Sequence, residues 1–230
     1  MAAGHFNWTQ FIPGVGSDVH VATAAVVGGL LVAASFVAKA KLGKGDQAVE
    51  PAGEFGVKAL FESFTDLMVY LCDMVLGAGK RKFVPLFGAI FVFVLFNNYA
   101  GLLPGMTPAT DNLNTTLAIG MFSFLAYNYF GIREHGFGYL KHFLGPVIWL
   151  APLMLPIELI SHAVRPASLG LRLAGNMTGD HTVLGIFLDL APAIIPVVFY
   201  GVGTFVCTIQ AFVFTLLSMV YVSMSISHDH

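Results

Sequence analysis

Uncharged apolar segments of about 20 residues recur along this chain, and their length limits the possible folds more than any other feature. A helix needs about 17–25 predominantly apolar residues to cross the hydrocarbon core of a bilayer. Only 10% of the 230 residues are charged, whereas 57% are hydrophobic. A soluble domain carries about 25% charged residues, so this chain could not cover its surface with polar groups in water. These observations predict an all-α polytopic membrane protein.

The apolar segments predict about five membrane-spanning helices within a single membrane domain, residues 1–230. Three of the predicted spans are short, over 19–38, 83–103 and 115–132. Two further segments exceed or match the length of one span, over 155–190 and 197–226. A span longer than the bilayer is thick can tilt, so we expect these two segments to form a long tilted hairpin.

Residues 55–79 differ from these spans because charged side chains recur along them at helical spacing. Intervals of four or seven residues separate Lys58, Glu62, Asp66 and Asp73. One charged stripe beside an apolar face is typical of a helix that lies in the plane of the membrane surface. We therefore predict an interfacial amphipathic helix in this segment.

Basic residues are distributed unevenly between the two sides of this arrangement. On one side lie 8 of the 11 Lys and Arg residues, namely Lys39, Lys41, Lys44, Lys80, Arg81, Lys82, Arg133 and Lys141. The opposite segments, 1–18, 104–114 and 191–196, contain neither Lys nor Arg. By the positive-inside rule, we expect the N-terminus outside and the C-terminus inside. A formal net charge of -2 argues against a nucleic-acid partner.

One permanent cation, Arg172, lies in the middle of the longest segment. It follows Leu155 by 17 residues and precedes Leu190 by 18, which is roughly 25 Å from either end at ~1.5 Å per helical residue. Insertion scales assign a central Arg a cost of about 2.5–3.5 kcal/mol, and a guanidinium cannot lose its proton to avoid that cost. The same segment holds further polar residues, Glu158, His162, Arg165, Ser168, Asn176, Asp180 and His181.

Three uses of the Arg172 charge are open from the residues alone. Arg172 could pair with an acid of its own chain, Glu158 or Asp180, and brace helices. It could anchor an anionic substrate in a self-contained proton-coupled secondary carrier. It could also face a carboxylate that belongs to another subunit.

Helical angles favour a partner outside the chain. At 100° per residue, Arg172 falls within about 40° of a line through Arg165, Ser168 and Asn176. Asp180 lies about 80° from that line and His181 about 180°, so both are poorly aimed at the guanidinium on a straight helix. The carrier interpretation is weakened by the absence of an internal repeat, which many secondary transporters contain.

Two long motifs in this region resemble subunit a of the rotary F-type ATP synthases. They read "RPASLGLRLAGNM" over 165–177 and "IQAFVFTLLSMVYVSMS" over 209–225. The "TPATDNLNTTLA" loop, 107–118, also fits, and the similarity extends from about residue 55 to the C-terminal end.

The resemblance implies a proton-translocating stator subunit with two offset half-channels. In that family, the residue at the position of Arg172 faces the carboxylates of the c-ring, and Ser168, Asn176 and Gln210 lie near that interface. Glu158 matches an acid of the inner half-channel, where we also place His162. We place Asp180 and His181 in the outer half-channel.

The resemblance also implies partners and a location. The partners are c-ring subunits, b-type peripheral stalk subunits, the remaining ATP synthase subunits and the lipid bilayer. The location is a bacterial inner membrane or an organellar energy-coupling membrane. ATP chemistry belongs to other subunits, so we expect no catalytic residue, cofactor or metal in this chain.

The chain departs from the family pattern at two places. The family sets a Glu or His nine residues after the Arg and a His or Glu partner seven residues before the Gln. This chain has His181 at the first place, as the pattern requires, but Gly203 at the second. We expect Asp180, next to His181, to supply the missing acid. In the loop, Asn112 holds the usual place of an Asp, and Asp111 comes just before it.

Overall fold

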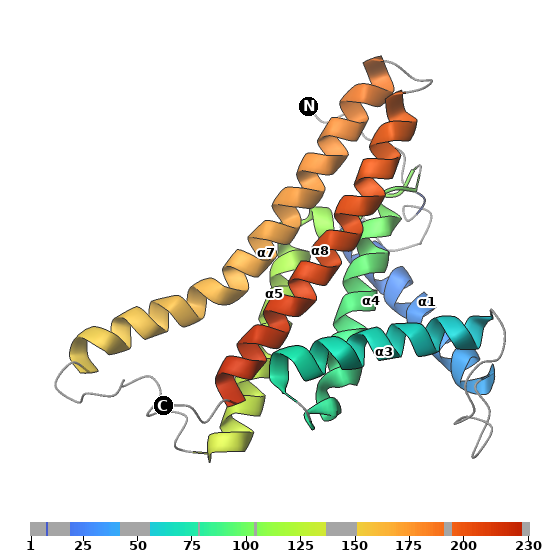
Figure 1. The fold of residues 1–230 in the computed structure, drawn as a ribbon. Helices are drawn as coiled ribbons and strands as arrows, with labels where there is room; N and C mark the ends of the chain where they lie inside the picture. Colours follow the sequence, from blue (N-terminus) through green and yellow to red (C-terminus); the bar gives the residue numbers. More distant parts are fainter. Residues whose placement is uncertain are drawn as a thin grey trace.

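The computed structural model describes residues 8, 19–41, 56–77, 79–103, 105–136, 151–190 and 195–226, and all regular secondary structure in this part of the chain is helical (Figure 1). The helices are α1 (Val19–Lys41), α3 (Val57–Leu76), α4 (Val84–Ala100), α5 (Leu113–His135), α7 (Ala151–Leu190) and α8 (Ile195–Ile226). Two short 3-10 turns, η2 (Arg81–Phe83) and η3 (Ala109–Asp111), precede α4 and α5. The predicted all-helical fold is confirmed.

Three segments of these helices are long and apolar enough to cross a membrane by length and composition, Val19–Lys39, Arg81–Ala100 and Val197–Ile226. With 23 and 40 residues, α5 and α7 also have the length of a span, but they carry more polar side chains. The chain therefore has the helices of a polytopic membrane protein, as predicted. Lys44, Lys141 and the turn 191–194, used in the prediction of sidedness, lie outside the described residues.

The helix α8 is the centre of the bundle and packs against α3, α4, α5 and α7 (Figure 1). Its Phe214, Met219 and Val222 side chains are fully buried. Two hydroxyls cross to neighbouring helices, since Ser223 Oγ donates to the Val75 carbonyl of α3 and Ser225 Oγ donates to the Tyr127 carbonyl of α5, each at 3.0 Å. Small hydroxyl side chains of this kind hold helices together where water is absent.

The helix α3 lies across the ends of the other helices instead of running beside them (Figure 1). One side of it is buried against the bundle, through Met68, Leu71, Cys72 and Leu76. A second side exposes apolar residues, Leu60, Leu67, Tyr70 and Met74, and its centre lies more than a right angle from the centre of the charged stripe at 100° per residue. A helix in the membrane surface would present these two faces to acyl chains and to water, and the interfacial position of α3 stays a prediction.

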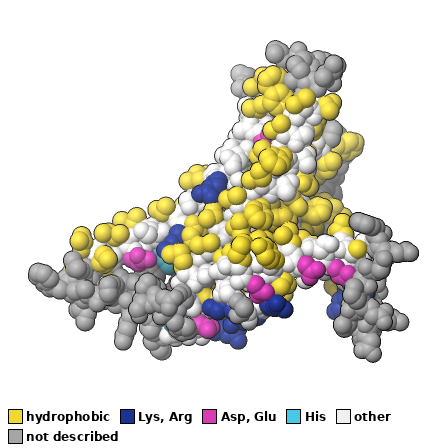
Figure 2. Space-filling model, in the orientation of Figure 1, with side chains coloured by type: hydrophobic (Ala, Val, Ile, Leu, Met, Phe, Trp, Pro, Cys, Tyr) yellow, Lys and Arg dark blue, Asp and Glu magenta, His cyan; other side chains and the backbone are white. Residues whose placement is uncertain are grey.

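Charged side chains gather at the same end of the molecule as α3 (Figure 2). Arg81 pairs with Asp73 at 3.0 Å, and Lys82 lies 3.8 Å from Glu134 at the end of α5. Above them, the visible surface is mostly hydrophobic (Figure 2).

The backbones of α5 and α7 touch through two glycines. A Cβ on Gly120 would lie 2.6 Å from the Pro166 carbonyl oxygen, and one on Gly170 would lie 3.1 Å from Leu117 Cα. Any larger residue would push the helices apart. Pro166 also removes one backbone hydrogen bond from α7, which accounts for the bend of this helix in Figure 1.

Candidate functional site

Arg172 is exposed on α7, and among the described residues no side chain forms an ion pair or hydrogen bond with it. Glu158, one of the two acids considered as its own-chain partner, lies 3.9 Å from Arg165 instead. Asp180, the other acid, faces α8 at Gly203. The interpretation in which Arg172 braces its own chain is therefore wrong for the part of the chain that the structure describes.

Arg165 and Ser168, which share the predicted stripe with Arg172, make local contacts. The Arg165 guanidinium lies over the Tyr221 ring of α8, 5.5 Å from its centroid, and its side chain is only 20% exposed. Ser168 Oγ donates to the Arg165 carbonyl at 3.0 Å. The two arginines of α7 thus differ. Arg165 contacts Tyr221 and Glu158 of its own chain, whereas the exposed Arg172 side chain is accessible to another molecule.

Asn176 and Gln210 connect α7 to α8 one turn beyond Arg172. Asn176 Nδ2 donates to Gln210 Oε1 at 2.7 Å. Gln210 is buried, and its Nε2 has no hydrogen-bond partner within the described residues. The sequence predicted both residues for the site, and the structure brings them into direct contact.

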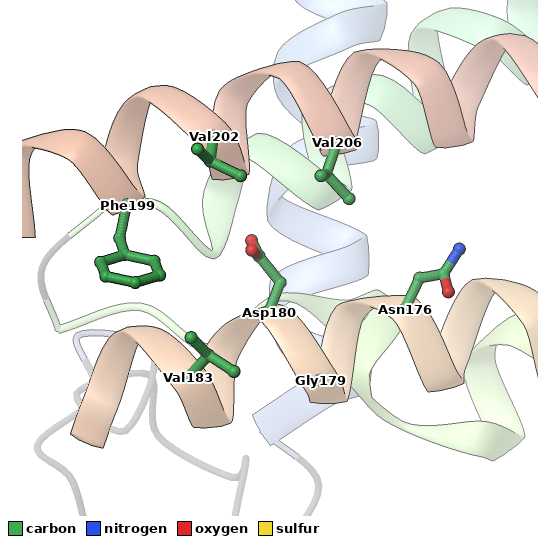
Figure 3. Close-up of a pocket in the computed structure, with 7 residues that line it drawn as sticks. All are labelled: Asn176, Gly179, Asp180, Val183, Phe199, Val202 and Val206. Atoms are coloured by element: carbon green, nitrogen blue, oxygen red, sulfur yellow. The ribbon is translucent and has the colours of Figure 1, made fainter. Parts of the chain in front are cut away.

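A pocket of about 330 Å³ opens between α7 and α8 beside this pair (Figure 3). In Figure 3, Asp180 rises from α7 toward α8 and its carboxylate lies between Val202 and Val206. The remaining lining residues are Asn176, Gly179, Val183 and Phe199. The Asp180 carboxylate is therefore the one acidic group in the lining of this mostly apolar pocket.

The Asp180 carboxylate occupies the space that a side chain at position 203 would need. A Cβ on Gly203 would lie 2.8 Å from Asp180 Oδ2 and 3.0 Å from Leu102 Cδ2. The glycine of α8 and the acid of α7 are thus sterically complementary.

His181 points to a different neighbour from Asp180, as a 100° step along a helix requires. Its Nε2 lies where a Cβ on Gly101 would be, beside the Pro108 ring. This Nε2 atom is buried and has no hydrogen-bond partner among the described residues. Asp180 and His181 therefore face two different sides of α7 at the same level.

His162, predicted for the inner half-channel, is buried between α5 and α7. Its ring makes edge-to-face contacts with Phe124 and Tyr127, with centroids 5.5 and 5.1 Å apart. Its Nε2 is hydrogen-bonded to Asn128 Oδ1 at 3.1 Å. Asn128 is not among the residues predicted from the sequence, although a lone amide in an apolar span is a signal that could identify it.

Asn112 and Asp111, at the start of α5, make different contacts, one within this helix and one with α7. Asn112 is the N-cap of that helix, and its Oδ1 accepts a hydrogen bond from the Asn114 amide at 2.9 Å. Asp111 instead accepts a hydrogen bond from Thr178 Oγ1 of α7, at 2.5 Å to Oδ1. The acid of the loop is therefore directed at α7, two residues before Asp180.

No group of three or more His, Cys, Asp or Glu residues in the described part of the chain could hold a metal ion. The two cysteines, Cys72 and Cys207, are buried and free.

Comparison with known proteins matches residues 20–223 to a family model described as ATP synthase A chain. A curated relative from Bdellovibrio bacteriovorus, "ATP synthase subunit a", is 55% identical over 98% of this chain and 99% of its own length. Proteins of the same name from Trichlorobacter lovleyi and Geobacter sulfurreducens are 46% and 47% identical, and the matches cover 76% and 70% of both chains.

Proposed function

The chain belongs to the ATP synthase A chain family, and on this basis we propose that it is the proton-translocating stator subunit of a bacterial F-type ATP synthase. The resemblance seen in the sequence is thereby confirmed. The chain is an integral membrane component of the complex, and ATP chemistry belongs to other subunits. Its proposed partners are the c-ring, the b-type peripheral stalk and the bilayer.

The exposed Arg172 side chain is the observation that carries this proposal. A guanidinium in the middle of a membrane-spanning helix is costly without an anion, and no Asp or Glu side chain pairs with Arg172 within the described residues. A carboxylate of the c-ring would meet it from outside, along the face of the α7–α8 hairpin. In lipid such a carboxylate stays protonated because desolvation disfavours its charged form, and close to Arg172 it ionises because an opposite charge favours that form.

Arg172 would also separate the two half-channels. A fixed cation repels a hydronium ion and cannot itself relay a proton. A ring carboxylate must therefore release its proton on one side of Arg172 and take up another on the other side. Each charge that crosses 100 mV carries about 2.3 kcal/mol, which would bias rotation of the ring.

The proposed outer half-channel is built around Asp180 and His181. The pocket of about 330 Å³ at Asp180 leads along α7 to the Asn176–Gln210 pair, one turn from Arg172. The fit of Asp180 against Gly203 supports the proposal that Asp180 replaces the acid that the family holds at the glycine position.

The proposed inner half-channel lies at the other end of α7, where Glu158 is near Arg165. His162 would form its wall, because the ring is buried among aromatic side chains and is hydrogen-bonded to Asn128. The gathering of Lys and Arg side chains at this end supports the proposed orientation, with the N-terminus outside and the C-terminus inside.

Purification and reconstitution test the proposal directly. The solubilised chain should copurify with a ring of small helical-hairpin subunits, and vesicles containing the whole complex should make ATP when a proton gradient is imposed. Vesicles containing this chain alone should show no solute transport coupled to protons. Coupled transport by the chain alone would instead establish a self-contained carrier.

A further inference from the structure

A second pocket, of about 230 Å³, lies where the start of α1 meets η3 and the loop before it. Its lining residues are Val19, His20, Thr107, Pro108, Asp111 and Asn112. Two titratable side chains from different elements, His20 and Asp111, share this lining, and both residues are half-buried. In the proposed orientation, this pocket is at the outer side of the membrane.

The Asp111 carboxylate lies between this pocket and α7. The helix cap is supplied by Asn112, so the acid is not needed there. Asp111 Oδ1 accepts a hydrogen bond from Thr178 Oγ1, and the same residue lines the pocket. An acid at the next position, where the family has it, would take the capping place that Asn112 fills here.

A single proline separates the pocket from His181. Pro108 lines the pocket, and its Cγ would lie 2.7 Å from a Cβ on Gly101, where His181 Nε2 also lies. That Nε2 is buried and has no partner among the described residues. His181 Nε2, which makes no hydrogen bond to a described residue, thus lies close to Pro108 in the lining of the pocket that contains Asp111 and His20.

We propose that this pocket is the outer mouth of the proton path and that Asp111 collects protons there, with His20 in the same lining. The Asp111 carboxylate would take a proton from a hydronium ion or a buffer acid, which leaves water or the conjugate base. It would then pass the proton toward His181 and Asp180 and return to its charged form. This inference rests on the proposed outer half-channel at His181 and Asp180.

Two matched variants of the complete ATP synthase in vesicles distinguish proton collection from a structural contact. Asp111→Asn keeps an oxygen that can accept the Thr178 hydrogen bond but cannot carry a proton between solvent and His181. Thr178→Val removes the hydrogen bond and keeps the carboxylate. The measurement is the rate of ATP synthesis under a fixed proton gradient, at low and at high outside concentrations of imidazole buffer.

Proton collection predicts that Asp111→Asn slows synthesis severalfold at low buffer concentration and recovers at high concentration, because a small buffer acid then delivers the proton. Thr178→Val should retain the normal rate. The inference is overturned if Asp111→Asn is as fast as the unmodified complex, if its defect does not respond to buffer, or if Thr178→Val is equally slow. Arg172→Ala distinguishes failure of the Asp111 proposal from failure of the proposed stator function. If the Arg172→Ala variant still made ATP, the proposed stator function itself would be contradicted.

Discussion

The carboxylate of Asp180 on α7 lies 2.8 Å from the point where a Cβ on Gly203 of α8 would be. A larger side chain at position 203 would therefore displace the Asp180 carboxylate. The chain places its acid on the first helix of the hairpin and leaves room for it on the second.

Gly203→Ala should therefore slow proton-driven ATP synthesis, because the added methyl group would push the Asp180 carboxylate out of its place. The matched control is Gly201→Ala, since a Cβ on Gly201 would meet nothing within 4 Å. Synthesis rates in vesicles with the reconstituted complex would measure the difference. Equal rates in the two variants would show that the position of the carboxylate does not matter.

Moving the acid from one helix to the other gives a second prediction. Asp180→Gly and Gly203→Glu should each impair synthesis, the first by removing the acid and the second by placing two carboxylates in one space. Together they should restore much of the rate, because one acid and one glycine again face each other. A double variant no faster than the slower single variant would contradict the proposed replacement.

Arg172→Ala should abolish proton-driven ATP synthesis while the complex still assembles. Arg172→Lys should also synthesise slowly, because a compact ammonium does not reproduce the planar, permanently charged guanidinium. Arg133→Ala, at an exposed position near the end of α5, is the control and should keep its rate. Assembly can be followed by copurification of the ring, so loss of the complex is distinguished from loss of function.

Gly120→Ala should destabilise the contact between α5 and α7, because its Cβ would lie 2.6 Å from the Pro166 carbonyl oxygen. Overpacking of this kind costs roughly 1–3 kcal/mol. Thermal unfolding of the detergent-solubilised protein would measure it, with Gly29→Ala as the control because nothing lies within 4 Å of its Cβ. An unchanged unfolding temperature for Gly120→Ala would mean that the two helices can separate freely.

The thiol of Cys72, on α3 and outside the predicted spans, should be inert in the folded protein. Burial, and then the charge of Asp73, raises the pKa of Cys72 from 9.0 to about 11. The folded state therefore retains a proton that the unfolded state loses, and the stability from this group is present below pH 9 and lost as the pH rises toward 11. In a Cys207→Ala background, maleimide labelling at pH 8 should be slow until the protein is denatured, and fast labelling of the folded protein would contradict this.

Much of the helical framework could be predicted from the sequence because the thickness of the bilayer's hydrocarbon core sets the minimum length of every spanning helix. The apolar segment predicted over 19–38 lies in α1 (Val19–Lys41), and those over 155–190 and 197–226 lie in α7 and α8. The different directions of Asp180 and His181 also follow from the 100° step of a helix. These features are local, so no knowledge of the neighbouring helices is needed.

The contacts between helices could not be predicted in the same way. The sequence gives no sign that the Arg165 guanidinium of α7 lies over the Tyr221 ring of α8. The same holds for the burial of His162 beside Asn128, and for the use of Asp111 to hold Thr178. Each of these pairs depends on how two helices are rotated and shifted against each other, and that is settled by packing across the whole bundle.

The direct contact of Gly120 with Pro166 and of Gly170 with Leu117 has a mechanical consequence. Arg172 follows Gly170 by two residues, so the guanidinium is carried by the part of α7 that lies closest to the backbone of α5 at Leu117. A force on the Arg172 side chain from a ring moving past it would be transmitted to α5 through this close contact. The proposed stator charge thus lies within two residues of a position where α7 approaches α5 too closely to admit a Cβ without a shift.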